Sequence, residues 1–152
     1  MAEKNELVVS AIREGTVIDH IPAQSLFKVI NILGLDRIES QITFGTNLDS
    51  KRLGKKAIIK IADLFFKDKE INKIALVAPS AKLNIIHDYQ VIEKKLVELP
   101  DEILGIVKCF NPKCVTNHEP VQTKFKVYTK MDVSLLCHYC QKITDQEHIQ
   151  IL

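Results

Sequence analysis

Two close pairs of cysteines constrain the fold of this chain more than any other feature of its sequence. Cys109 and Cys114 are separated by four residues, Cys137 and Cys140 are separated by two, and a spacer of 22 residues lies between the pairs. Two pairs on short loops can converge on one ion, and four thiolates form the closed tetrahedral shell of a structural Zn²⁺. The spacing therefore predicts a metal site with these four cysteines as its ligands and one ion per chain.

Three other uses of the cysteines stay open: two disulfides, a redox Cys-x-x-Cys pair, or four unrelated thiols. Disulfides need an oxidising compartment, and the charged residues 1–6 have none of the apolar character of a signal peptide. A redox pair at Cys137 and Cys140 would leave the first pair unexplained. Iron accepts the same four thiolates, so the pattern by itself does not separate zinc from iron.

Length and charge narrow the class of protein. The segment 101–152 is small enough to need a metal or a disulfide to fold, and it holds 6 Lys or Arg and 6 Asp or Glu. Four thiolates and one divalent ion would make it net negative, whereas a zinc ribbon that binds nucleic acid should be basic. This disfavours the main alternative, a nucleic-acid-binding accessory protein.

No apolar run approaches the ~20 residues of a membrane span. We expect a cytoplasmic protein with neither nucleic acid nor membrane as a partner.

Hydrophobic periodicity divides residues 1–100 into strands and helices. The expected strands cover 7–20, 41–48, 56–61, 82–87 and 89–99, and the expected helices cover 21–33 and 68–78. This β-α-β-β-α-β order with one added strand is the ferredoxin-like pattern, an α+β fold with an antiparallel sheet and two helices on one face.

Four residues mark the expected breaks and ends of these elements. Gly15 suggests a bulge or bend within the first strand, and Gly34 suggests the end of the first helix. Asp68 is expected to cap the second helix, and Pro79 is expected to end it. The polar stretch 47–54 is expected to form a loop.

Pro100 marks the expected boundary between a first domain at 1–100 and a second at 101–152. In the second domain, short strands are expected at 103–108, 123–129, 133–136 and from 143 onward, with the cysteine pairs on the turns between them. The sequence therefore predicts a small all-β zinc-binding domain of the rubredoxin or zinc-ribbon type.

The sequence contains no motif that would indicate an enzyme. It has no G-x-S-x-G, no P-loop and no G-x-G-x-x-G, and only 5 glycines, so any bound phosphate would have to meet lysines. An acid beside a histidine at Asp19-His20 can orient the imidazole, although each residue alone is an ordinary surface residue. A pocket for a small anion or a nucleotide results only if five polar residues converge on one sheet: Asp19, His20, Lys60, Asn84 and Lys94.

A resemblance to one family covers nearly the whole chain. Its most specific parts are the segment 15–24, Gly-Thr-Val-Ile-Asp-His-Ile-Pro-Ala-Gln, and the spacing of the cysteines. Further matching residues are Gly45, Asn47, Leu48, Gly54, Lys56, Ala78, Pro79, Asn84, Tyr89, Val91, Lys94, Asn111, Glu119 and Pro120. On these residues the chain resembles the regulatory chain of aspartate carbamoyltransferase, an enzyme of pyrimidine biosynthesis.

The resemblance implies a non-catalytic, allosteric chain. In this family the N-terminal domain binds nucleoside triphosphates, typically CTP and ATP, and the zinc domain docks onto the catalytic chain. The resemblance also implies a regulatory homodimer within a larger hetero-oligomer. The nucleotide-binding residues that it implies are Ala11, Ile12, Val17, Asp19, His20, Lys60, Asn84, Ile86, Tyr89, Val91 and Lys94.

The polar members of this set would bind the phosphates and the sugar. By the resemblance, Lys60 and Lys94 would supply positive charge, and Asp19 together with Lys60 would hold the ribose hydroxyls. His20 would lie near the phosphates, so its protonation would strengthen binding. Lys56 would contact a second nucleotide or a bridging metal, as in some relatives.

The remaining members would recognise the base. By the resemblance, Val17, Ile86 and Val91 would wall the ring. Backbone carbonyls near Ile12 and Tyr89 would accept from the exocyclic amine that CTP and ATP share.

The chain departs from the family's pattern in two places. Glu6 stands where relatives often carry a basic residue beside a second nucleotide, which puts cooperation between CTP and UTP in doubt. Phe110 and Pro112-Lys113 alter the first metal loop, which faces the catalytic chain in the family. A third interpretation, a small-molecule-sensing domain attached to an unrelated enzyme, differs from the resemblance only in its partner.

Overall fold

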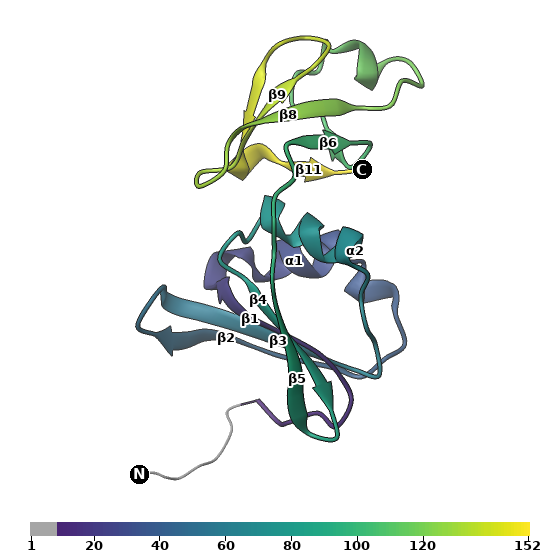
Figure 1. The fold of residues 1–152 in the computed structure, drawn as a ribbon. Helices are drawn as coiled ribbons and strands as arrows, with labels where there is room; N and C mark the ends of the chain where they lie inside the picture. The colour runs from purple at the N-terminus through teal and green to yellow at the C-terminus, as the bar shows by residue number, and fades with distance from the viewer. Residues whose placement is uncertain (1–8) are drawn as a thin grey trace.

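The computed structural model describes residues 9–152, so the start of the expected first strand and Glu6 lie outside the described residues. Five strands form one sheet in the order β2-β3-β1-β4-β5, and every neighbouring pair is antiparallel. They are β1 (Gly15–Pro22), β2 (Ile42–Ser50), β3 (Gly54–Ala62), β4 (Lys82–His87) and β5 (Gln90–Leu96). Figure 1 shows α1 (Leu26–Ile32) and α2 (Asp68–Lys73) on the same face of this sheet. The α+β fold predicted from periodicity is confirmed.

A second, smaller unit follows the sheet and stands over the two helices (Figure 1). Four of its strands form a sheet in the order β10-β9-β8-β6, and the other two form a short antiparallel pair. They are β6 (Glu102–Leu104), β7 (Val107–Lys108), β8 (Lys124–Thr129), β9 (Ser134–Cys137), β10 (Ile143–Asp145) and β11 (Gln150–Ile151). The prediction of short strands around the cysteine pairs is confirmed.

The core of the larger unit lies between its sheet and its helices. It contains the apolar residues of β1, β3 and β4 that face the helices, together with the inner faces of α1 and α2. Its buried residues include Ile18, Ile21, Leu26, Val29, Ile59, Ile61, Ile71 and Leu83. Burial of such side chains stabilises the fold by roughly 1.5–3 kcal/mol each. Among the described residues, no helix is long and apolar enough to span a membrane.

β1 begins later than the sequence predicts, because residues 9–14 form an irregular segment. Gly15 starts the strand with φ 138°, and a Cβ there would lie 2.0 Å from the carbonyl oxygen of Ile61, so only glycine fits. The bulge expected at Gly15 falls instead at Asp19 and His20, where the pairing of β1 with β3 shifts and His20 has φ 58°.

Three other boundaries also test the sequence analysis. The expected loop at 47–54 is wrong, because β2 continues to Ser50 and only residues 51–53 form the turn. α2 has Asp68 as its first residue and Lys67 as its N-cap, and it ends at Lys73 before a 3₁₀ turn (Ile74–Leu76), well short of Pro79. The end of α1 near Gly34 is confirmed, since Gly34 is left-handed with φ 65°.

Candidate functional site

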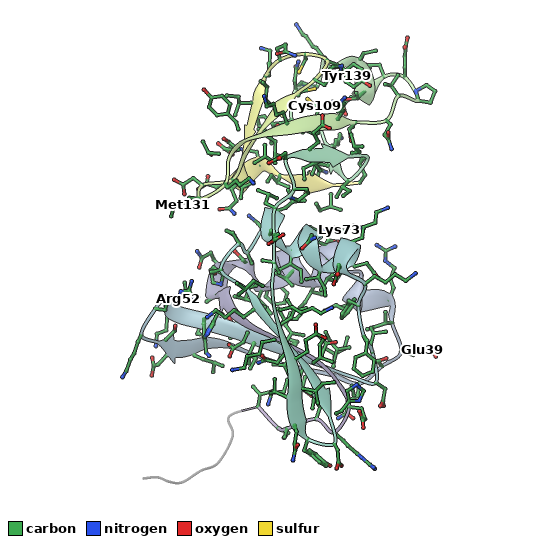
Figure 2. The ribbon with its side chains drawn as sticks, in the orientation of Figure 1. Glu39, Arg52, Lys73, Cys109, Met131 and Tyr139 are labelled. Carbon is green, nitrogen blue, oxygen red and sulfur yellow. The ribbon has the colours of Figure 1, made fainter. Side chains whose placement is uncertain are left out.

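The four cysteines gather at one point of the smaller unit. Cys109 and Cys114 bound the loop after β7, while Cys137 ends β9 and Cys140 follows it across a tight turn. Their four sulfur atoms all lie within 4.8 Å of one another. Figure 2 shows Cys109 and Tyr139 toward the end of this unit that lies farther from the helices, with Met131 nearer to them.

The distances between the sulfur atoms fit a four-coordinate ion. The Sγ atoms of Cys109 and Cys140 are 3.6 Å apart, and those of Cys114 and Cys137 are 3.7 Å apart. A tetrahedron with metal–sulfur bonds of about 2.3 Å places its sulfur atoms about 3.8 Å apart. A disulfide would need about 2.05 Å. The arrangement therefore supports the predicted metal site and not the alternative with two disulfides.

Hydrogen bonds hold the first metal loop in shape. The Nδ2 group of Asn117 donates to the carbonyl oxygens of Cys109 and Asn111, at 3.0 and 2.8 Å. The Asn111 carbonyl also accepts from the backbone N–H of Cys114 at 3.0 Å, and its side chain accepts from Lys113 N–H at 3.1 Å. These bonds shape the outer edge of the loop and orient both of its thiols inward.

The cluster sets the protonation of its own thiols. Burial raises the pKa of the Cys109 and Cys137 thiols, because it disfavours a charged sulfur. Burial also acts to raise the pKa of Cys140, but hydrogen bonding with the Lys142 backbone and the Asn111 side chain brings that pKa to about 7. A thiol must lose its proton to bind a divalent ion, so binding of the ion releases protons and the affinity for the ion rises with pH.

A row of predicted nucleotide residues crosses the larger sheet. Val17 of β1 lies opposite Lys60 of β3 on one side and opposite Asn84 of β4 on the other. Asn84 in turn lies opposite Lys94 of β5. Side chains directly opposite one another in antiparallel strands project from the same face. Since the neighbouring Ile18 is buried against the helices, this row lies on the face that α1 and α2 do not cover.

The bulge in β1 places an ion pair beside this row. Asp19 accepts a hydrogen bond from Lys56 Nζ at 2.8 Å and another from the backbone N–H of His20 at 2.7 Å. The Nδ1 atom of His20 is buried and has no hydrogen-bond partner in the described part of the chain. The carbonyl oxygen of His20 accepts from Ser80 Oγ at 2.9 Å, which fixes the backbone of the bulge.

Lys60 is buried although it belongs to the row. Its ammonium group donates to the Val9 carbonyl oxygen at 2.8 Å, so the segment before β1 covers it. Burial lowers the pKa of Lys60, while the charge of Asp19 acts to raise it. Val9, Lys56 and Lys60, with Asn47, Leu48, Asp49 and Ile58, line a cavity of about 490 Å³.

Apart from Val17, which belongs to the row, the residues predicted to contact the base lie near the start of β1. Ile86 pairs with Gly15 on one side and with Val91 on the other. Tyr89 lies in the turn between β4 and β5, where its backbone N–H donates to the Arg13 carbonyl at 3.0 Å. That bond sets the turn beside the irregular segment 9–14, which contains Ala11 and Ile12. Nine of the eleven predicted residues thus lie in β1, β3, β4, β5 or the turn between the last two, and Ala11 and Ile12 lie in the segment before β1.

Sequence reasoning missed several contacts that shape these sites. These contacts join residues that are far apart in the sequence or that lie in irregular segments. They are the bonds of Val9 to Lys60, of Glu14 to the β4–β5 turn and of Asn117 to the metal loop. No periodicity signals such bonds. Lys56 and Lys60 are two positions that periodicity can relate, because they lie four residues apart in one expected strand and so share a face, and both line the cavity described above.

Comparison with known proteins matches nearly the whole chain to one family. Residues 7–98 match the family described as "Aspartate carbamoyltransferase regulatory chain, allosteric domain", and residues 101–150 match the metal binding domain of the same chain. The chain is 58% identical over 149 residues to the aspartate carbamoyltransferase regulatory chain of Bacteroides thetaiotaomicron, covering 98% of this chain and 97% of the relative. It is 51% identical over 146 residues to that of Pyrococcus horikoshii, covering 95% and 96%.

Proposed function

This chain belongs to the family of aspartate carbamoyltransferase regulatory chains, and from that premise we propose that its larger unit binds nucleoside triphosphates as allosteric effectors. CTP and ATP are the effectors proposed. The binding unit would be residues 1–100. The metal-binding unit would be residues 101–152, with zinc as its ion and the catalytic chain as its neighbour.

One observation carries the nucleotide proposal: the antiparallel register brings Lys60, Val17, Asn84 and Lys94 into one row on the open face. Such a row offers two cations, an amide and an apolar side chain to a single extended ligand. Lysine binds phosphate as a point charge, and the amide can donate and accept. A nucleoside triphosphate could place its phosphates near a lysine, its sugar hydroxyls near the amide and its base near the apolar side chain.

The bulge beside the row supplies the remaining polar groups. Asp19 can accept from ribose hydroxyls, and the imidazole of His20 lies beside it, with its Nδ1 atom 3.7 Å from Asp19 Oδ1. A bound phosphate would compete with Asp19 for Lys56, and with the Val9 carbonyl for Lys60. Nucleotide binding would thereby move the segment before β1.

The zinc proposal rests on the chemistry of the ligands. Four thiolates with no open position are the ligand set of structural zinc, and a thiolate site of this kind is stable in a reducing compartment such as the cytoplasm. The ion would close the loops at Cys109–Cys114 and Cys137–Cys140, which carry the exposed side chains of Phe110 and Tyr139. We propose that these loops contact the catalytic chain in a hetero-oligomer assembled from regulatory homodimers.

Allostery needs two states and an effector that binds them unequally. The two units touch where Gln146 Nε2 donates to the Leu76 carbonyl at 3.4 Å, and the chain crosses between them at Pro100. We propose that nucleotide binding shifts the sheet and that this contact passes the shift to the metal-binding unit. Coupling between such sites usually amounts to about 1–3 kcal/mol.

Calorimetric titration of the metal-loaded chain with CTP tests the nucleotide proposal. We expect binding in the micromolar range, lost or strongly weakened in Lys94→Ala. The matched control is Lys95→Ala, because Lys95 is the next residue of β5, projects from the other face and bonds to Asp68 at 2.9 Å. A sizing column run with the catalytic chain in parallel should show a complex for all three proteins. Equal loss of binding in both variants, or no binding by the unaltered chain, would overturn the proposal.

A further inference from the structure

A hydroxyl group from outside the set of four cysteines lies against one of their sulfur atoms. Oγ1 of Thr116 is 3.2 Å from Sγ of Cys114. Within the described part of the chain, this sulfur atom is the one hydrogen-bond partner of the hydroxyl. Cys114 is buried and Thr116 is half-buried, so bulk water is partly kept from the contact.

The local backbone fixes the position of this hydroxyl. Thr116 is the middle residue of a 3₁₀ turn (Val115–Asn117) that follows Cys114 directly. The backbone N–H of Asn117 donates to the Cys114 carbonyl at 2.9 Å, and its side chain donates to the Cys109 carbonyl at 3.0 Å. None of these bonds uses the side chain of Thr116, whose branched Cβ restricts χ1. The turn should therefore keep its shape when only the hydroxyl is removed.

The state of the sulfur atom decides the direction of this hydrogen bond. A thiolate that binds a metal has no proton, so the Thr116 hydroxyl has to donate and Cys114 has to accept. Hydrogen bonds to a charged acceptor are roughly twice as strong as those between neutral groups. Four thiolates around one divalent ion carry excess negative charge, and a donor at the sulfur atom disperses part of it.

The other three sulfur atoms have donors of a different kind. Those of Cys109, Cys137 and Cys140 accept from backbone N–H groups of neighbouring loop residues. A backbone donor stays in place whatever side chain the residue carries. The donor to Cys114 is a side chain, so one substitution can remove it while the four ligands stay unchanged.

We propose that Thr116 is a positioning residue of the metal site, whose hydroxyl donates to the Cys114 thiolate and thereby raises the affinity of the four cysteines for zinc. This rests on the proposed zinc function. Groups that hydrogen-bond to metal ligands fix the orientation of those ligands, and their removal typically lowers metal affinity by about 10–100-fold.

The first measurement is the Zn²⁺ affinity of the full chain at pH 7, by competition with a chelator of known affinity. Thr116→Val removes the hydroxyl and keeps the shape, so we expect roughly tenfold weaker binding. Thr116→Ser keeps the hydroxyl and should stay within about threefold of the unaltered chain. Thr129→Val is the matched control, because it removes a threonine hydroxyl that bonds to the Asp132 carbonyl in the β8–β9 turn. It should also stay within about threefold.

A second readout is needed because a weaker fold alone would also lower the affinity for the ion. Co²⁺ in place of zinc gives a sulfur-to-metal charge-transfer band whose energy depends on hydrogen bonds to the sulfur atoms. Loss of a donor leaves the Cys114 thiolate richer in electrons, so Thr116→Val should shift this band to longer wavelength. Thr116→Ser and Thr129→Val should leave the band in place.

The outcomes separate this inference from the proposed function. An unchanged affinity and band in Thr116→Val, or equal changes in Thr129→Val, would overturn the inference alone. If Thr116→Val fails to fold, Thr116→Ala against Thr116→Ser gives the same comparison, because these variants differ only in the hydroxyl. Absence of zinc binding by the unaltered chain would overturn the proposed zinc function and this inference with it.

Discussion

Asp19 shows at the scale of one residue how the site balances its charges. Burial acts to raise the pKa of Asp19, but the hydrogen bond from Lys56, the backbone N–H of His20 and the charges of both residues lower it below its usual range. The side chains of Asp19 and Lys56 are only 22% and 20% exposed, so water screens their interaction weakly. The pair is therefore strong enough to affect the stability of the fold.

Replacing Lys56 by Met should make this contribution measurable. A carboxylate whose folded pKa is depressed adds stability above its unfolded pKa of about 3.9, and this stability is lost as pH falls through the folded pKa. We expect Lys56→Met to lower the free energy of unfolding by about 1–2 kcal/mol at pH 7. The deficit relative to the unaltered chain should shrink below about pH 4 and vanish once Asp19 is protonated in both proteins.

Urea denaturation of the unaltered chain and of Lys56→Met at the same pH values measures the difference between their free energies of unfolding. Effects of pH that both proteins share cancel in this difference. Lys55→Met is the control, because Lys55 pairs with the fully exposed Asp49 and should show no measurable change. A deficit that stays constant down to pH 3 would contradict the role given to Asp19.

Single residues also mark what the sequence could and could not predict about the site. The motif Asp19-His20 and the two cysteine pairs can be recognised in the sequence, because the members of each lie close together in the chain. The row from Lys60 to Lys94 depends on the register of four strands, which a one-residue slip would turn to the other face. Glu14 and Val9 act from an irregular segment, where no periodicity exists, so their contacts could be known only from the fold.

At the scale of elements, β1 organises the larger sheet. It lies at the centre between β3 and β4, and its bulge carries two of the proposed ligand residues. Its first residue, Gly15, lies so close to the Ile61 carbonyl that the start of the strand depends on the absence of a side chain. The same glycine sets the direction in which the preceding segment, with Glu14, leaves the sheet.

Substituting Gly15 by Ala should therefore be costly. The added Cβ would meet backbone at 2.0 Å, and φ 138° is unfavourable for alanine, so we expect a loss of at least about 2 kcal/mol in the free energy of unfolding. Gly54→Ala is the matched control: Gly54 has φ 79° with nothing within 4 Å of the added atom, so it should cost only about 1–2 kcal/mol. Thermal and urea unfolding would compare them. Equal losses would show that the approach to Ile61 does not matter.

The elements were predicted better than their ends. The order of strands and helices followed from periodicities that persist over many residues, such as the alternation along β3. The ends did not, because they depend on contacts outside the element. β2 continues to Ser50 since its partner β3 supplies the pairing, whatever the polarity of residues 47–50. α2 ends at Lys73 and tightens into a 3₁₀ turn before the chain enters β4.

At the scale of the whole molecule, the two units depend on different sources of stability. The larger one buries an apolar layer between sheet and helices, whereas the smaller one has a few apolar residues, among them Phe125 and Leu135, around its cysteines. A unit of that size needs its ion, which contributes roughly 10–16 kcal/mol in small zinc peptides. The two units should therefore respond differently when the metal is withdrawn.

Chelation should unfold residues 101–152 and leave the larger sheet folded. Limited proteolysis followed by mass spectrometry would show new cleavage confined to the smaller unit, while the helical signal of α1 and α2 in circular dichroism persists. Re-addition of Zn²⁺ should restore protection of the smaller unit against the protease. Acid should promote release of the ion, because the thiols must be deprotonated to bind it. If the smaller unit resists the protease after the metal is shown to be gone, the role given to the ion is wrong. The same holds if both units unfold together.

We propose that an effector on the sheet of the larger unit changes the activity of a catalytic chain bound through the smaller one. The most direct measurement is the aspartate saturation curve of the reconstituted complex with and without CTP. We expect CTP to shift half-saturation by about fivefold or more in the complex, and to leave both the isolated catalytic chain and the complex of Lys94→Ala unchanged. A curve that CTP does not move, in a complex shown to bind CTP, would contradict the account.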